Sequence, residues 1–206
     1  MDALRLFVAI EVAPGLRGRI LEIEEELARC GADVKWVPGP NLHLTLKFLG
    51  ETPRAKLDPV KAAMEGATRN RSGFELSFSG VGAFPNTRQP RVIWIGVERG
   101  HSHLHDLAAA VDDALAGVGF AREDKGFTPH LTIGRVRSGR NLHALSEAIE
   151  GLSPGGPSGP GGPGGVGRGG RGVEVGSMDV SRVLLMESKL RPQGPVYSVL
   201  AEYALR

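Results

Sequence analysis

One short pattern occurs twice in this 206-residue chain, and the repetition constrains the fold more than any other feature. The two copies are the tetrads His43-Leu44-Thr45-Leu46 and His130-Leu131-Thr132-Ile133. Each lies in an apolar run, and side chains alternate between the two faces of a strand. Each tetrad therefore predicts a strand with the imidazole and the hydroxyl on one face and aliphatic side chains on the other. Two such strands predict a duplicated unit.

The remaining chain repeats a similar order of elements around the tetrads. Apolar runs and alternation predict strands over residues 4–12, 41–50, 74–81, 91–98, 127–136, 180–187 and 195–205. Helical spacing predicts helices over about 14–29, 53–67, 102–116 and 141–152. We therefore expect one α+β domain over 1–206. Its duplicated, pseudo-symmetric unit has two lobes, in which two antiparallel sheets flank a central cleft with helices on the outside.

Residues 153–172 differ in composition from the rest of the chain. They contain eleven glycines and four prolines and almost nothing to bury. No predicted strand leads into a glycine turn here and no helix starts on one, as a phosphate-binding loop requires. The segment is therefore interpreted as a flexible Gly/Pro-rich insertion at the surface.

The first tetrad strand has a predicted core face and a predicted polar face. Strict alternation places Lys47 on the polar face with His43 and Thr45. The predicted core face carries Leu42, Leu44, Leu46 and Phe48. Trp36 and Trp94 lie in other apolar runs, which favours the core over a role as base platforms.

The composition limits the possible partners and cofactors. The formal net charge is +2, so a nucleic acid would have to be held by local basic groups. Cys30 is the single cysteine, which excludes an internal disulfide and favours a reducing compartment. We expect no signal peptide or membrane helix, a cytoplasmic location and a monomer. The His101-Ser102-His103-Leu104-His105 run offers no third ligand at a suitable spacing, so no metal is expected.

Two opposed imidazoles suit the cleavage of a phosphodiester. Near neutral pH, imidazole can act as an acid in one copy and as a base in the other. One group accepts the proton of the attacking water while the other donates a proton to the departing oxygen. Thr45 and Thr132 lie on the same strand faces as the imidazoles, so each hydroxyl can donate to a phosphoryl oxygen.

Three segments carry a resemblance to a known family: NLHLTLKFLG at 41–50, FTPHLTIGR at 127–135 and ESKLRPQGPVYSVLAEYAL at 187–205. They resemble the 2H phosphoesterase superfamily. Within it, they most resemble the RNA 2′,3′-cyclic phosphodiesterases, also called 2′-5′ RNA ligases or LigT-like proteins. The resemblance runs from residue 4 to residue 205 and excludes only the Gly/Pro-rich insertion.

The resemblance implies hydrolysis of an RNA terminal 2′,3′-cyclic phosphate to a 2′-phosphomonoester, without metal or cofactor. It implies that His43 is the proton donor to the leaving 3′ oxygen and that His130 is the base that activates water. Pseudo-symmetry leaves these two roles exchangeable. Thr45 and Thr132 match the hydroxyl positions of the family motif, and Arg135 matches a position that contacts the phosphate. Strict alternation turns Arg135 away from this face, so a bulge is required, which Gly134 could supply.

Other functions remain open at this stage. The same groups would serve 2′-5′ ligation of tRNA halves, another cyclic nucleotide phosphodiesterase, or a non-catalytic RNA- or nucleotide-binding module. The expected partner is RNA with a 2′,3′-cyclic phosphate end, such as a tRNA fragment, or a small cyclic nucleotide. The intact tetrads favour an enzyme over a binding module.

Overall fold

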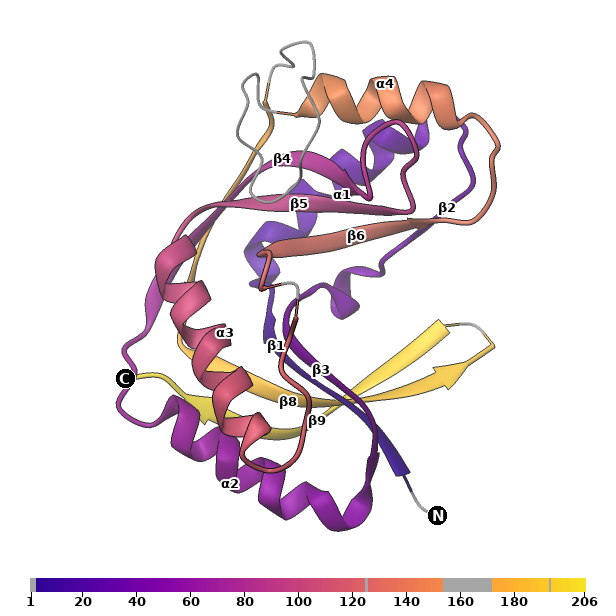
Figure 1. Ribbon diagram of the computed structural model, residues 1–206. Helices are drawn as coiled ribbons and strands as arrows, with labels where there is room; N and C mark the ends of the chain where they lie inside the picture. Colours follow the sequence, from indigo (N-terminus) through magenta and orange to yellow (C-terminus); the bar gives the residue numbers. More distant parts are fainter. Residues whose placement is uncertain (1–2, 125, 154–171, 193) are drawn as a thin grey trace.

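The computed structural model describes residues 3–124, 126–153, 172–192 and 194–206 (Figure 1). The strands are β1 (Ala3–Glu11), β2 (Val34–Trp36), β3 (His43–Pro53), β4 (Phe74–Phe84), β5 (Val92–Arg99), β6 (His130–Val136), β7 (Glu174–Val180), β8 (Arg182–Arg191) and β9 (Gly194–Ala204). The helices are α1 (Pro14–Ala28), α2 (Leu57–Thr68), α3 (His101–Ala116) and α4 (Leu142–Leu152). The α+β class is confirmed. The flexible insertion expected at 153–172 lies almost entirely outside the described residues, which leave out 154–171.

The strands form one antiparallel sheet, and the expectation of two separate sheets is wrong. The strand order is β7-β4-β5-β6-β3-β1-β8-β9, and β2 pairs with β6. The junction between the halves is the pairing of β3 with β6, whose register consists of the single pair Leu44 and Leu131. The two tetrad strands thus approach closely enough to bridge once, and that bridge makes the sheet continuous.

All four helices cover one face of this sheet. The α1 helix packs against β6, β7 and α4, while α2 packs against α3 and β9. Figure 1 shows α1 and α4 over the half that contains β4, β5 and β6, and α2 and α3 over the other half. One continuous core cluster lies beneath them and includes Leu44 and Leu131. The histidines and threonines that alternate with these leucines therefore lie on the opposite face, away from the helices.

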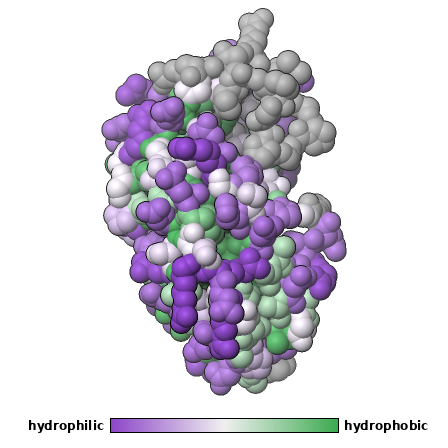
Figure 2. Space-filling view, turned by 90° about the vertical axis from the view of Figure 1, so that its left-hand side faces the viewer, coloured by the Kyte–Doolittle hydropathy of each residue, from purple (hydrophilic) through white to green (hydrophobic). Residues whose placement is uncertain are grey.

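The outer surface is mainly polar on the side seen in Figure 2, which views the molecule from the left of Figure 1. Hydrophilic side chains dominate this side, with smaller hydrophobic areas between them. Within the described residues, no helix is long and apolar enough to cross a membrane.

Two elements differ from the sequence-based expectation. The predicted helix at 53–67 begins only at Leu57, because β3 continues to Pro53 and a 3₁₀ turn follows at Arg54–Lys56. Pro59 therefore lies in the first turn of α2, where its missing N–H costs nothing. Strand β7 was not expected. It pairs with β4 along the edge of the sheet, and its glycine, serine and aspartate weaken the apolar alternation.

Candidate active site

The register of the sheet brings the two tetrads together. Leu44 and Leu131 are paired and buried on the helix side. Because the strands are antiparallel, this pairing places His43 toward Thr132 and Thr45 toward His130 on the opposite face. All four of these side chains are half-buried. The sequence-predicted histidines and threonines thus share one face at the junction of the two halves.

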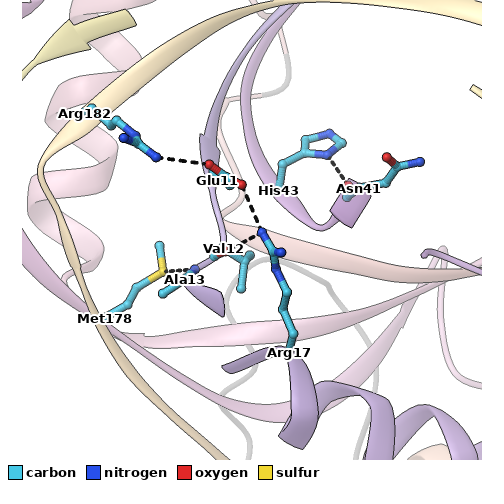
Figure 3. A network of polar contacts seen from close by, with 8 residues as sticks. All are labelled: Glu11, Val12, Ala13, Arg17, Asn41, His43, Met178 and Arg182. Atoms are coloured by element: carbon cyan, nitrogen blue, oxygen red, sulfur yellow. Dashed lines mark hydrogen bonds and ion pairs between the residues drawn. The ribbon is translucent and has the colours of Figure 1, made fainter. Parts of the chain in front are cut away.

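The two imidazoles are held by the same local contact. His43 Nδ1 lies 2.7 Å from the carbonyl oxygen of Asn41, as Figure 3 shows. His130 Nδ1 lies 2.8 Å from the carbonyl oxygen of Thr128. A carbonyl can only accept, so each Nδ1 carries a proton and donates it. Nε2 is therefore the nitrogen that could exchange a proton with a bound group in each copy.

Aromatic rings pack against both imidazoles. The His43 ring lies 4.9 Å from the ring of Phe7 and 5.2 Å from that of Tyr197, between ring centroids. The His130 ring meets Phe84 edge-on at 4.9 Å. Burial lowers the pKa of His43 and that of His130 below 6.5, against the opposing effect of their carbonyl hydrogen bonds. Both rings therefore favour the neutral form near pH 7.

Arg135 acts on both imidazoles from the strand β6. The register of β6 against β5 shifts between Thr132 and Gly134, so Ile133 is the extra residue of a bulge. The bulge expected next to Gly134 is therefore present, and it turns Arg135 to the histidine face. Its positive charge lowers the pKa of His43 and of His130. The exposed guanidinium thus lies within electrostatic reach of both rings.

The first tetrad strand has the same bulge, and two predictions for it are wrong. Thr45 pairs with Ala9 and Lys47 with Val8, so Leu46 is the extra residue. The shift turns Lys47 into the protein, where it is 3% exposed. Its Nζ donates to Asp112 Oδ1 at 2.5 Å and to the carbonyl of Ala121 at 2.7 Å.

The bulge that turns Lys47 inward turns Phe48 outward. It was expected in the core, yet it is 63% exposed and lies on the histidine face, paired with Phe7. The bulge reverses the alternation at this point, so a hydrophobic side chain that the pattern assigns to the core is turned outward.

An ion-pair network lies beside His43 on strand β1. Glu11 is the direct register partner of His43. Its carboxylate accepts from Arg17 at 2.9 Å and from Arg182 at 3.3 Å (Figure 3). Two guanidinium groups thus share this carboxylate.

Trp94 is also placed differently from the expectation. It pairs with Thr132 and with Gly82, on the face opposite the core, and contacts Phe84 at 5.3 Å between ring centroids. A Cβ on Gly82 would lie 2.3 Å from the indole, so only glycine lets the ring lie flat there. Trp36 is half-buried against the core, as predicted.

The helix histidines make ordinary structural contacts. His101 Nε2 lies 2.7 Å from the carbonyl oxygen of Val97, and the His103 ring stacks on Phe74. Among the residues whose positions are described, no three His, Cys, Asp or Glu side chains gather where they could hold a metal ion.

Sequence reasoning missed Tyr197 and Phe7 as parts of this site. Burial raises the pKa of the Tyr197 phenol, while the charges of Arg135 and Arg5 oppose that shift. Tyr197 therefore lies within electrostatic reach of both arginines. The only sequence signal is that it belongs to the last of the three segments that carry the family resemblance.

Comparison with known proteins identifies the family of this chain. Residues 10–94 match the family model described as LigT like Phosphoesterase. The chain is 37% identical to an RNA 2′,3′-cyclic phosphodiesterase of Methanothermobacter thermautotrophicus, over 98% of this chain and 99% of that protein. A protein of the same name from Archaeoglobus fulgidus is 36% identical, over 96% and 98%. A solved structure from Thermus thermophilus superposes with a TM-score of 0.76 at 28% identity, covering 98% of each chain. The chain belongs to the LigT-like phosphoesterase family.

Proposed function

We propose that this protein is an RNA 2′,3′-cyclic phosphodiesterase that opens the cyclic phosphate to a 2′-phosphomonoester. The full-length likeness to relatives of that name supports the reaction class. The observation that carries the proposal is the matched pair of Nδ1 to carbonyl hydrogen bonds, which leaves Nε2 of His43 and of His130 available on one face. Two such nitrogens suit a base and an acid acting on opposite sides of one phosphorus.

The reaction follows from these roles. The cyclic phosphate binds on the histidine face where the two halves join, and His130 Nε2 accepts a proton from water as the water oxygen attacks phosphorus. The bond from phosphorus to O3′ breaks, and His43 Nε2 gives its proton to that oxygen. The products are a 3′-hydroxyl and a 2′-phosphate. Pseudo-symmetry permits the reverse assignment of the two imidazoles when the substrate binds the other way round.

The hydroxyls and the positive charge around the two imidazoles would stabilise a bound phosphate and the transition state of this step. The hydroxyls of Thr45 and Thr132 donate to the non-bridging oxygens, and Arg135 balances the charge that develops on them. Arg135 also lowers the pKa of both imidazoles. A bound phosphate reverses this effect, because its negative charge favours the protonated ring that serves as the acid.

An oligoribonucleotide with a 2′,3′-cyclic phosphate end, incubated in EDTA, tests the proposal. We expect a 2′-phosphate product, separated from the 3′ isomer by chromatography. We expect His43→Ala and His130→Ala to lower kcat/KM at least about 10²-fold, the usual contribution of general acid–base catalysis. His143→Ala is the matched control, because that imidazole is exposed on α4.

Persistence of the cyclic end with folded wild-type protein refutes the hydrolase. Loss of activity in EDTA would refute the two-imidazole mechanism and indicate a metal-dependent one. A joined 2′-5′ product from two RNA fragments indicates a ligase, and tight binding without turnover indicates a binding module.

A further inference from the structure

The hydrophobic side chains that remain exposed are concentrated on one part of the sheet. Of the large exposed hydrophobics in the described chain, only Leu21 lies outside β3, β8 and β9. The others are Phe48, Leu190, Val196 and Val199, with exposed fractions of 63%, 69%, 50% and 47%. Clustered exposed apolar groups of this kind mark a binding surface more often than scattered single ones do.

The sheet register places most of this surface on the histidine face. Phe48 pairs with Phe7, Phe7 with Met186, and Met186 with Val199, so these four side chains cross four adjacent strands. Paired residues in an antiparallel sheet point to the same face. Phe7 contacts His43, and Tyr197 contacts both Phe7 and His43. We call Phe7, Phe48, Met186, Tyr197 and Val199 the apolar strip.

In the duplicated motif, Phe48 of the first copy occupies the position equivalent to that of Arg135 in the second. Both tetrad strands bulge directly after the threonine, at Leu46 and at Ile133. The residue two positions beyond the bulge is turned to the histidine face in each copy. It is Arg135 in one half and Phe48 in the other. One side of the imidazole pair therefore offers a cation, and the other offers an exposed aromatic ring.

A cation also stands at the far end of the apolar strip. Arg5 precedes Phe7 by two residues on β1, so it lies on the same face about 7 Å further along the strand. Its charge reaches Tyr197. Its ion pair with Glu51 is long, at 4.0 Å, and exposed, so it offers little resistance to a competing anion. Arg5, Lys189 and Leu190 also line a cavity of about 450 Å³ at this end of the sheet.

We propose that the apolar strip binds the nucleotide on the 5′ side of the one that carries the cyclic phosphate. Its base stacks on Phe48, and the phosphate beyond it is drawn to Arg5. The inference rests on the proposed function and adds a preference for RNA ends over single cyclic nucleotides. Aromatic stacking and a cation along the backbone are the usual means of holding single-stranded RNA.

Distance along the strip assigns Phe48 to the second nucleotide. Tyr197 touches the His43 ring directly, within the reach of the terminal nucleoside. Phe48 lies one ring further from His43, because it packs on Phe7, with 6.2 Å between the centroids of the Phe7 and Phe48 rings. The terminal base therefore meets Tyr197 first, and the ring of Phe48 remains for the base that follows.

The ratio of kcat/KM for two substrates tests this inference. The substrates are the dinucleotide ApA ending in a 2′,3′-cyclic phosphate and adenosine 2′,3′-cyclic phosphate alone. We expect the wild-type protein to favour the dinucleotide by roughly tenfold, the scale of one stacked base. Phe48→Ser removes most of that preference, and Arg5→Gln lowers it and weakens its dependence on salt. Leu21→Ser, which changes another exposed apolar residue, on α1, keeps the wild-type ratio.

Three results would overturn the inference. The first is a wild-type protein that does not distinguish the two substrates. The second is a Phe48→Ser variant that keeps the ratio or loses activity equally on both, which would assign Phe48 to the terminal base or to no base. The third is a concentration-dependent dimer that Phe48→Ser dissociates, because the strip would then bind a second copy of the chain. A folded wild-type protein that is inactive on both substrates refutes the proposed function itself.

Discussion

Glu24 gives the stability of this protein a strong dependence on pH. It lies on the buried side of α1 and is 7% exposed. Within the described part of the chain, its Oε1 has no hydrogen-bond partner. Burial raises the pKa of this carboxyl from 4.5 to about 8. The folded protein therefore holds the proton over a range of pH in which the unfolded chain releases it.

The sign and the size of the effect follow from that difference. Between pH 4.5 and 8 the folded state binds more protons at Glu24 than the unfolded state, so the free energy of unfolding falls as pH rises. The contribution is complete below pH 4.5 and is lost by pH 8. One pKa unit corresponds to about 1.4 kcal/mol, so the loss is about 3 kcal/mol at pH 7 and about 5 kcal/mol above pH 8.

Urea unfolding of the wild-type protein and of Glu24→Gln at pH 5, 7 and 8.5 measures this loss. The amide stays neutral, so the variant should gain stability relative to the wild type as pH rises, by about 2.5 kcal/mol between pH 5 and 7. Glu25→Gln, an exposed neighbour on the same helix, is the matched control. A difference between wild type and Glu24→Gln that stays constant across this pH range would refute the reasoning.

Two further predictions concern the bulged strands. Lys47→Ala should lower the free energy of unfolding by about 3 kcal/mol, because it removes a buried partner of Asp112. A loss below about 1 kcal/mol in urea unfolding would contradict this, and replacing Lys47 and Asp112 together by methionine and leucine should restore stability. Arg135→Gln should move both limbs of the pH profile of kcat/KM to higher pH, because Arg135 lowers the pKa of both imidazoles. The profile of Arg137→Gln serves as the control, and limbs that stay in place in Arg135→Gln would exclude an electrostatic role for Arg135.

Strand alternation and helical periodicity were enough to predict most of the elements. Leu44 and Leu131 lie in the core, and the two histidines share a face, because alternation holds from the histidine to the threonine of each tetrad. Arg135 came from the family resemblance, and a bulge had to be assumed to place it. Periodicity alone assigned Arg135 to the wrong face, and only the family resemblance predicted it as part of the site.

The errors have a common physical cause. A bulge inserts one residue, and every side chain after it changes face. Lys47 and Phe48 follow such a bulge, so the pattern placed each on the wrong side. The bulge depends on the pairing of β3 with β1, a contact between distant segments that a local pattern does not contain. Trp94 was misplaced for a related reason, because only the glycine on the neighbouring strand lets an indole lie on the polar face.

The single bridge between the halves links the folding of this protein to its chemistry. Leu44 and Leu131 anchor the β3 and β6 strands from beneath, inside the helix-covered core, and each lies between the imidazole and the hydroxyl of its own strand. The register that brings the two imidazoles to one face is therefore fixed by hydrophobic packing on the far side of the sheet. Under the proposed function, a substitution at Leu44 or Leu131 changes the spacing of the two imidazoles as well as the stability, so the centre of this core should tolerate less change than its edges.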